Sequence, residues 1–284
     1  MSNPDREPLA LPDPFILYHN GVYYAYGSRN EEGIPVYTSD DMLNWKYHGI
    51  AFHQDNAWSD KLFWAPEVYK VKDRFVMYVT VNWHISAAFA DSPCGPFIQD
   101  KNTPIWPHER SIDNSLFIAP DGQAYVFWNR GDPNGVYVAE VESDLVTVRA
   151  GTLRLCVTPE LPWETIQNTI CEGPFCIEHE GKYILTYSVN DYRSQDYSIG
   201  AAEADHPLGP WKKYDQPLLR RPGQLVGTGH HSFFHDKDGK MRAVFHAHHS
   251  ETEIHPRLTY ITDVTFTDGK IALSPEYTAL KVIR

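Results

Sequence analysis

Acidic residues recur along this chain, each at the start of a short run rich in aromatic and β-branched residues. The residues at the head of five such runs are Asp13, Glu67, Asp113, Glu172 and His230. Two carboxyl groups can hydrolyse a glycosidic bond when one is protonated and donates to the leaving oxygen, while the other is ionised and activates water. A third acidic group nearby keeps the acid protonated by like-charge repulsion. This chemistry requires a fold that brings the distant carboxylates together.

The runs that carry these residues repeat as a unit. Successive heads are separated by 46 to 59 residues. Each unit begins with one strand-like run, passes through a tight turn and continues with a second and then a third run. Helical periodicity is nearly absent, so short antiparallel strands are expected. Glycine supplies the positive φ that hairpin turns need at Asn20-Gly21, Asp121-Gly122, Glu180-Gly181 and Asp238-Gly239.

A repeat of this length, with up to four short strands, predicts a β-propeller. Five units fill the chain without a linker, so we expect an all-β, five-bladed β-propeller that forms a single catalytic domain over residues 1–284. In a propeller the first strand of each blade lines the central channel, so the five heads should converge at one mouth. Gathering acidic groups costs stability through their mutual repulsion, which indicates that the arrangement serves a function.

The composition excludes several classes of partner. The 284 residues carry a formal net charge of −12, and no basic run is longer than Arg220-Arg221. Nucleic acids and anionic membrane surfaces both require a basic patch, so neither is expected as a partner, and an uncharged substrate fits better. No apolar run of about 18 residues is present, so no membrane span is expected. Aromatic residues make up 13% of the chain, which suits strands and the binding of sugar faces.

The cysteines and the start of the chain bear on its environment. We interpret the cysteines as reduced thiols without zinc-ligand spacing: Cys94, Cys156, Cys171 and Cys176. The first residues lack the basic segment and apolar stretch of a signal peptide, so a cytoplasmic location is expected. No organic cofactor is expected, and the sequence does not indicate an oligomeric state.

Five motifs, in this order along the chain, resemble glycoside hydrolase family 43: LPDPF, FWAPEV, SIDNSLF, CEGPF and GTGHHSFF. The resemblance implies a five-bladed propeller glycosidase with an inverting mechanism, of the α-L-arabinofuranosidase and β-xylosidase group. It matches Asp13 to the general base that activates water and Glu172 to the general acid. Asp113 matches the carboxylate that orients the acid and raises its pKa. In an inverting enzyme the two reacting carboxyl groups stand about 6.5–9.5 Å apart, which leaves room for water.

The same resemblance implies further roles around the channel. His230 matches a histidine that lies beside a bound calcium ion or water, so calcium in the central channel is a candidate cofactor. The family has Asn at the next position, where this chain has His231. We assign His231 to substrate contact, with core packing as the alternative. Trp64 is expected to stack on the sugar face and Arg257 to reach toward the first sugar, while Glu67 is expected to brace the channel.

Two other features mimic functional signatures. The cluster of His246, His248, His249 and His255 suggests a metal site, and strand alternation would put His246 and His248 on one face. We interpret the cluster instead as packing, with His248 near the channel. The segment RGDPNG at 130–135 resembles a fructan-hydrolase signature, but it follows the second strand of its unit, so we interpret it as a turn.

The function that the sequence favours is hydrolysis of an O-glycosyl bond. We expect an exo-acting glycosidase that releases terminal α-L-arabinofuranose or β-D-xylose from oligosaccharides derived from plant polysaccharides. A family member acting on β-linked galactose is an alternative. A non-catalytic sugar-binding propeller is another, although such a module would be free to lose Glu172. A scaffold for protein partners would not gather carboxylates at one mouth.

Overall fold

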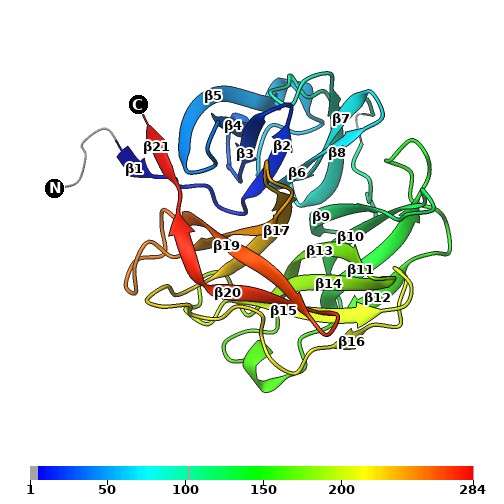
Figure 1. Cartoon of the computed structure of the whole chain (residues 1–284). Coiled ribbons are helices and arrows are strands. Elements are labelled where there is room, and N and C mark those ends of the chain that lie inside the picture. Colours follow the sequence, from blue (N-terminus) through cyan, green and yellow to red (C-terminus); the bar gives the residue numbers. More distant parts are fainter. Residues whose placement is uncertain (1–5, 102, 284) are drawn as a thin grey trace.

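The sheets of this protein are arranged as the blades of a propeller (Figure 1). The computed structural model describes residues 6–101 and 103–283. Five sheets surround a central channel, with the first strand of each blade toward the centre and the last toward the outside. The all-β, five-bladed fold expected from the repeat is confirmed.

Within each blade the strands pair antiparallel in chain order. Blade 1 contains β2 (Phe15–His19), β3 (Val22–Tyr26), β4 (Gly33–Ser39) and β5 (Asn44–His53). Blade 2 contains β6 (Phe63–Val71), β7 (Arg74–Val81) and β8 (His84–Ala90). Blade 3 contains β9 (Ser111–Ile118), β10 (Ala124–Gly131), β11 (Asn134–Val141) and β12 (Arg154–Val157). Blade 4 contains β13 (Cys171–His179), β14 (Lys182–Val189), β15 (Ser198–Ala204) and β16 (Lys212–Lys213). Blade 5 contains β17 (Gly229–His235), β18 (Met241–Ala247), β19 (Leu258–Thr267) and β20 (Lys270–Ala279).

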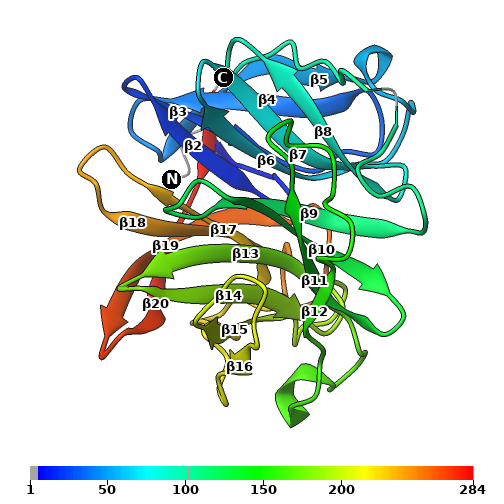
Figure 2. The ribbon, with the colours of Figure 1, turned by 90° about the vertical axis from the view of Figure 1, so that its right-hand side faces the viewer.

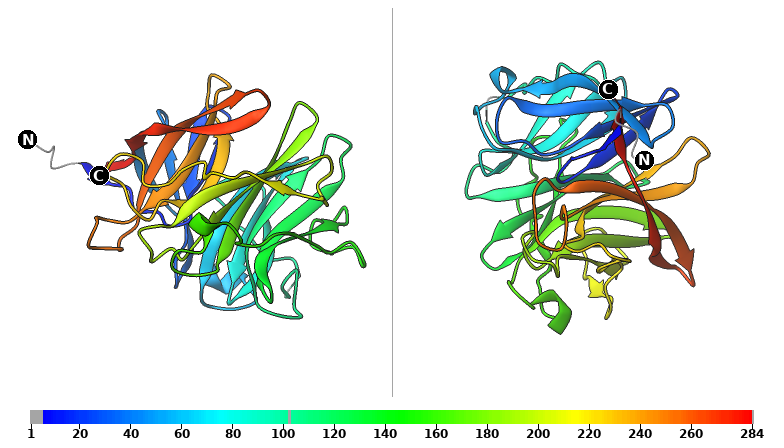
Figure 3. Two further views of the ribbon diagram at one scale, coloured as in Figure 1. Left: turned by 90° about the horizontal axis from the view of Figure 1, so that it is seen from below. Right: turned by 90° about the vertical axis from the view of Figure 1, so that its left-hand side faces the viewer.

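The first and last described strands close the ring at blade 1. β1 (Arg6–Pro8) pairs antiparallel with β21 (Lys281–Ile283), and β21 pairs in parallel with β5. Figure 3 shows these two strands together at one edge of the molecule. Because the segment that follows blade 5 joins the sheet of blade 1, backbone hydrogen bonds hold the ring shut.

Apolar side chains fill the space between neighbouring blades. Phe52 of blade 1 packs edge to face on Phe63 of blade 2, with ring centroids 5.7 Å apart, and Phe175 of blade 4 packs on Phe233 of blade 5 at 5.4 Å. Figure 2 shows the sheets of blades 2, 3 and 4 following one another down the side of the molecule. Close packing of this kind resists deformation, so the blades hold the channel residues in fixed positions.

The other described segments are loops and two short helical turns. η1 (Gln54–Asn56) and η2 (Pro162–Glu164) each contain three residues. Among the residues that the structure describes, no helix is long and apolar enough to cross a membrane. All four cysteines are free.

A residue with positive φ marks the start of the channel strand in every blade. These residues are Asp13 (53°), Ala65 (47°), Asp113 (58°), Gly173 (54°) and His230 (44°). In blades 2 to 5 the pairing with the second strand shifts register at this place, which identifies a β-bulge. A bulge bends its strand and re-aims a side chain. Here the repeated bulge lies at the channel mouth.

This repeated bulge corrects the alignment of two of the five predicted heads. Blade 2 places Ala65 at the bulge instead of Glu67, and blade 4 places Gly173 there instead of Glu172. Glu67 therefore lies two residues further along its strand, away from the mouth. Glu172 lies one residue before the bulge, the position that Trp64 occupies in blade 2. The five units of the sequence were aligned on their acidic residues, whereas the units of the structure are aligned by the backbone position that has positive φ.

Candidate active site

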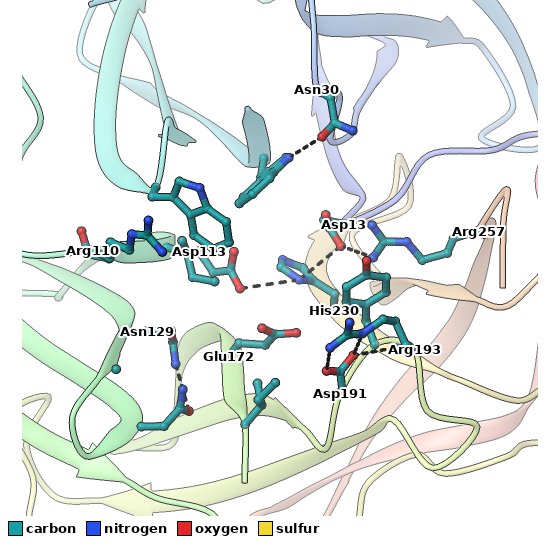
Figure 4. A pocket seen from close by; sticks show the side chains of 18 of the residues that line it. Asp13, Asn30, Arg110, Asp113, Asn129, Glu172, Asp191, Arg193, His230 and Arg257 are labelled. Carbon is teal, nitrogen blue, oxygen red and sulfur yellow. Dashed lines mark hydrogen bonds and ion pairs between the residues drawn. The ribbon is translucent and has the colours of Figure 1, made fainter. Parts of the chain in front are cut away.

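A cavity of about 810 Å³ opens at the mouth of the channel where the first strands begin (Figure 4). This volume lies in the usual range for a site that binds a small ligand. Six of the residues singled out from the sequence line it: Asp13, Trp64, Asp113, Glu172, His230 and Arg257. The bulges thus bring together residues that are far apart along the chain.

Hydrogen bonds between blades hold the bulges in place. In every blade the N–H of the residue with positive φ donates to a side chain of the preceding blade. The pairs are Asp13 with His246 Nδ1 (3.2 Å), Ala65 with Ser28 Oγ (2.8 Å), Asp113 with Thr80 Oγ1 (2.8 Å) and His230 with Ser188 Oγ (2.8 Å). In blade 4 the acceptor on the preceding blade is a carboxylate, because the N–H of Gly173 donates to Asp113 Oδ2 at 3.3 Å. The carboxylate of Asp113 therefore belongs to the framework that positions Glu172.

Asp13 is surrounded by cationic and polar donors. Arg257 Nη1 donates to Asp13 Oδ1 at 2.8 Å, and Ser28 Oγ donates to Asp13 Oδ2. The Nδ1 atoms of His230 and His246 both lie 3.4 Å from Asp13 Oδ1. Burial raises the pKa of Asp13, but the charge of Arg257 and these neighbours outweigh it, so the pKa lies well below its ordinary value. Asp13 is therefore ionised at neutral pH.

Asp113 and Glu172 have the opposite environment. Burial, then the charge of Glu172, raises the pKa of Asp113 well above its ordinary value. Burial, together with the charges of Asp13 and Asp191, raises the pKa of Glu172 to about 7. Tyr197 Oη donates to Glu172 Oε1 at 2.8 Å, which opposes this rise without cancelling it. The two carboxyl groups titrate as a pair, and this pair retains a proton to near-neutral pH.

Two residues that the sequence analysis did not assign to the site connect its two sides. His246 is fully buried; its Nε2 lies 3.3 Å from Arg257 Nη1, and its ring stacks on Tyr197 with centroids 5.7 Å apart. Tyr197 in turn binds Glu172. The available signal for His246 was its alternation with His248 along one strand, because that pattern places both on the same face. No motif pointed to Tyr197.

His230 lies between the two sides. Its Nδ1 is 3.4 Å from Asp13 Oδ1 and 3.9 Å from Asp113 Oδ2 (Figure 4). Burial lowers the pKa of His230, and Arg257 lowers it further, while Asp13 opposes the shift. His230 is therefore a neutral ring that can bridge the carboxylates.

The residues around His230 do not form a ready calcium site. Calcium takes six to eight oxygen ligands, whereas His230 offers a nitrogen and the oxygens of Asp13 are engaged by Arg257 and Ser28. Within residues 6–101 and 103–283, no group of three or more His, Cys, Asp or Glu side chains is arranged to hold a metal ion. Calcium in the channel stays a prediction.

Two tryptophans of blade 2 form an aromatic wall of the cavity. Trp64 packs edge to face on Trp83, with ring centroids 4.8 Å apart, and its Nε1 donates to Asn30 Oδ1 at 2.9 Å. These contacts leave Trp64 at the cavity surface, where a sugar face could stack. The segment RGDPNG forms the tight turn between β10 and β11, as predicted, and Asp132 in this turn also lines the cavity.

The wall on blades 4 and 5 is built from longer loops. Tyr192 and Arg193 come from residues 190–197, and His255 and Arg257 come from the segment that follows β18. His248 Nε2 contacts the carbonyl of Tyr192 at 2.7 Å. Gly227, with φ +61°, passes so close to His248 that a Cβ there would lie 2.1 Å from the ring. The histidines that resembled a metal cluster therefore fasten loops or line the wall.

Two of the residues singled out from the sequence, His231 and Glu67, do not line the cavity. His231 is 2% exposed, and its Nε2 lies 2.6 Å from Thr186 Oγ1 on the neighbouring blade, so it packs between blades and does not line the cavity. The position of His231 therefore does not support the predicted contact with substrate. Glu67 is buried in the channel and is hydrogen-bonded to Tyr69, which fits a bracing role.

Comparison with known proteins identifies the class of enzyme that this fold and site define. The sequence profile of Glycosyl hydrolases family 43 matches residues 7–271. The endo-1,4-beta-xylanase from Bacteroides thetaiotaomicron VPI-5482, known from its crystal structure, superposes with a TM-score of 0.94 and 39% identity, over 99% of both chains. A thermostable family-43 glycoside hydrolase superposes with a TM-score of 0.87 and 33% identity, over 95% of this chain and 94% of the other.

Among curated sequences, the arabinoxylan arabinofuranohydrolase of Paenibacillus polymyxa is 26% identical over 87% of this chain. The match spans 46% of that protein, so this chain has about half its length. The chain belongs to glycoside hydrolase family 43.

Proposed function

We propose that this protein is an inverting, exo-acting glycosidase that releases terminal α-L-arabinofuranose or β-D-xylose from short oligosaccharides derived from plant polysaccharides. The observation that carries the proposal is the opposite direction of two pKa shifts in one cavity. The pKa of Asp13 is held well below its ordinary value, while that of Glu172 is raised to about 7. Acid and base of a glycosidase need this separation, because one must be protonated while the other is ionised.

Glu172 acts as the general acid in this proposal. Because Tyr197 donates to Oε1, the other oxygen is left to carry the proton and donate it to the leaving glycosidic oxygen. Asp113 supports this role in two ways. Its Oδ2 accepts from the N–H of Gly173, the residue after Glu172, and its nearby carboxyl group disfavours a second negative charge.

Asp13 acts as the general base. Its carboxylate accepts a proton from the attacking water, while Arg257 and Ser28 fix the orientation of both oxygens. The water attacks the anomeric carbon on the face opposite the leaving group, so the released sugar has inverted configuration. Arg257 is itself packed on the ring of Tyr192, with Cζ 4.6 Å from the ring centroid, so its guanidinium is held against Asp13.

The shape of the cavity mouth supports exo action on a terminal sugar. The second and third strands are joined by two-residue turns in blades 2 and 3 but by long loops in blades 4 and 5, so the mouth has one high side. A chain entering from the low side can place only its end against the high wall. The named activities of relatives include arabinofuranosyl and xylan substrates, so both pentoses are candidates.

The test uses purified protein and Glu172→Gln with two kinds of substrate. One kind is the set of 4-nitrophenyl glycosides of α-L-arabinofuranose, β-D-xylopyranose and β-D-galactopyranose. The other is a set of arabino- and xylo-oligosaccharides. A nitrophenolate leaves without much help from an acid, whereas a sugar hydroxyl needs protonation. Glu172→Gln should therefore lose about 10³-fold in kcat/KM on oligosaccharides and much less on the nitrophenyl glycoside.

The same assay decides among the alternatives. The preferred nitrophenyl glycoside identifies the sugar, and proton NMR of the fresh product shows whether its configuration is inverted. Release of single pentoses supports exo action, and internal cleavage of longer chains contradicts it. Binding of oligosaccharides with no cleavage of any substrate would move the assignment to a sugar-binding propeller.

A further inference from the structure

Three arginines line the cavity, and they differ in their partners. Arg257 pairs with Asp13 at 2.8 Å, and Arg193 Nε donates to Asp191 Oδ1 at 2.7 Å. Arg110 has no carboxylate partner among the residues that the structure describes. The adjacent Glu109 is already engaged by Arg130, whose Nη2 lies 2.6 Å from its Oε1. Arg110 is therefore a cavity arginine whose charge is not neutralised by an ion pair.

Arg110 is held by an aromatic ring instead of an acid. Its guanidinium carbon lies 5.0 Å from the ring centroid of Trp83. A guanidinium stacked on an indole keeps its N–H groups available, because the contact uses its flat face. Planar, bidentate donation from such a group is the arrangement that recognises carboxylates. The N–H groups of Arg110 are thus available to donate to an anionic group of a ligand.

The support beneath Arg110 is rigid. Trp83 is 36% exposed and lies in the two-residue turn between β7 and β8, where Asn82 and Trp83 both have positive φ. The carbonyl of Trp83 accepts from the N–H of Ser111 at 2.9 Å, and its ring packs on Trp64. The conformation of this turn is therefore set by the fold before any ligand binds.

The position of Arg110 indicates which part of a substrate it meets. Figure 4 shows Arg110 on the opposite side of the cavity from Arg193 and Arg257. That is the low side, bounded by the short turns of blades 2 and 3. An oligosaccharide whose terminal sugar lies between Asp13 and Glu172 continues out of the cavity over this side. Its next sugar would meet the indole of Trp83 and the guanidinium of Arg110.

We propose that Trp83 and Arg110 form a subsite for a uronic acid, a sugar that presents a flat carbon face and a carboxylate. The inference rests on the proposed function, because it places the uronic acid beyond the bond to be cleaved. The rest of the molecule would repel an anionic ligand, since the chain has a net charge of −12 and the cavity contains several acids. Arg110 supplies the attraction that lets an acidic oligosaccharide bind there.

The experiment compares two ligands that differ only in charge. One is a xylo-oligosaccharide with a glucuronic acid branch next to its terminal xylose. The other is the same compound after reduction of the carboxyl group to an alcohol. Binding is measured by calorimetry on the Glu172→Gln protein, so that no turnover is needed, and kcat/KM is measured on the active protein. The quantity of interest is the ratio between the two ligands, because any loss common to both cancels.

The acidic ligand should bind about tenfold more tightly than its reduced form. Arg110→Met removes the charge and should bring the ratio to one or below. Arg110→Lys keeps the charge but loses the bidentate geometry of the guanidinium, so it should keep part of the preference. Arg154→Met, on the outer strand β12, is the control and should leave the ratio unchanged. Added salt should reduce the preference in the wild type.

The outcomes separate the two proposals. Equal binding of the two ligands by the wild type, or a preference that survives in Arg110→Met, overturns the uronic acid subsite. Hydrolysis of neutral glycosides together with such a result leaves the glycosidase proposal standing. Charge-dependent binding through Arg110 without any hydrolysis would instead refute catalysis and keep the subsite.

Discussion

The two sides of the active-site cavity contain carboxyl groups in opposite states, although they are built on the same backbone feature. Asp13 and Asp113 are both the residue with positive φ at the start of the channel strand of their blades, with φ of 53° and 58°. Asp13 faces Arg257 and Ser28, while Asp113 faces Glu172 and has no cation within hydrogen-bonding distance among the described residues. The first has a lowered pKa and the second a raised one.

This difference shows that the fold sets where each carboxyl group lies, whereas the neighbouring side chains set its protonation state. Both aspartates are buried, so burial alone would raise both pKa values. On one side a guanidinium reverses that effect, and on the other a second carboxyl group adds to it. A repeat that delivers one residue per blade to the mouth can therefore produce a base and an acid pair from similar residues.

Removing the base should have the largest effect. Asp13→Asn deletes the proton acceptor and should lower kcat/KM by about 10⁴-fold. Because water must be activated whatever the leaving group, nitrophenyl glycosides and oligosaccharides should lose the same factor, in contrast to Glu172→Gln. Initial rates on both substrates check this. A loss confined to oligosaccharides would mean that Asp13 assists departure of the leaving group.

The acid side should be sensitive to loss of one member of its pair. Asp113→Asn keeps an oxygen that can accept from Gly173 but removes the repulsion between two carboxylates. Because the charge of Glu172 raises the pKa of Asp113, the pair should hold its proton to higher pH than Glu172 alone, so in this variant the alkaline limb of the kcat/KM profile should move to lower pH. Activity at neutral pH should drop by about 10²-fold. An alkaline limb that stays in place would show that Asp113 does not help Glu172 to keep its proton.

Arg257 connects the two sides, so replacing it tests both at once. Its charge lowers the pKa of Asp13 and also of Asp113 and Glu172. In Arg257→Met all three pKa values should rise, so the acid limb and the alkaline limb should both move to higher pH. The loss of positioning should lower kcat/KM by about 10²-fold. The pH profile is the decisive readout, since a structural defect alone would lower the rate without moving both limbs.

The sequence was sufficient for the overall architecture and for the residues that gather at the mouth. Five repeated runs, four of them followed by a Gly turn, predicted five blades, because strand alternation and hairpin chemistry are local properties. Asp13, Asp113, Glu172 and Trp64 line one cavity, as the convergence of first strands predicted, and Arg257, assigned from the family resemblance, lines it as well. The catalytic roles assigned to the acids remain predictions for the experiments above.

Other features depend on contacts that no local pattern encodes. The bulge of blade 2 falls on Ala65, two residues before the acid that the repeat suggested, because the bulge is fixed by a hydrogen bond to Ser28 of the neighbouring blade. The burial of His231 between blades, and the place of His246 beside Asp13, likewise depend on which strand faces which across a blade boundary. Arg110 comes from a connection between blades, where no periodicity gives the direction of a side chain.

The smallest effect is expected from substitution of Tyr197, which adjusts the pKa of Glu172 but is not the cause of its rise. Its hydroxyl donates to Glu172 and lowers the pKa of that carboxyl group, against the larger effect of burial. Tyr197→Phe should therefore raise the pKa of Glu172 and move the alkaline limb to higher pH, with a change in kcat/KM of about fivefold or less. Tyr187→Phe is the matched control, because Tyr187 is also buried but binds Glu164, away from the cavity. Its alkaline limb should not move. If both variants shift the limb alike, the effect comes from altered packing of the blades; a shift in Tyr197→Phe alone assigns it to the hydrogen bond on the acid.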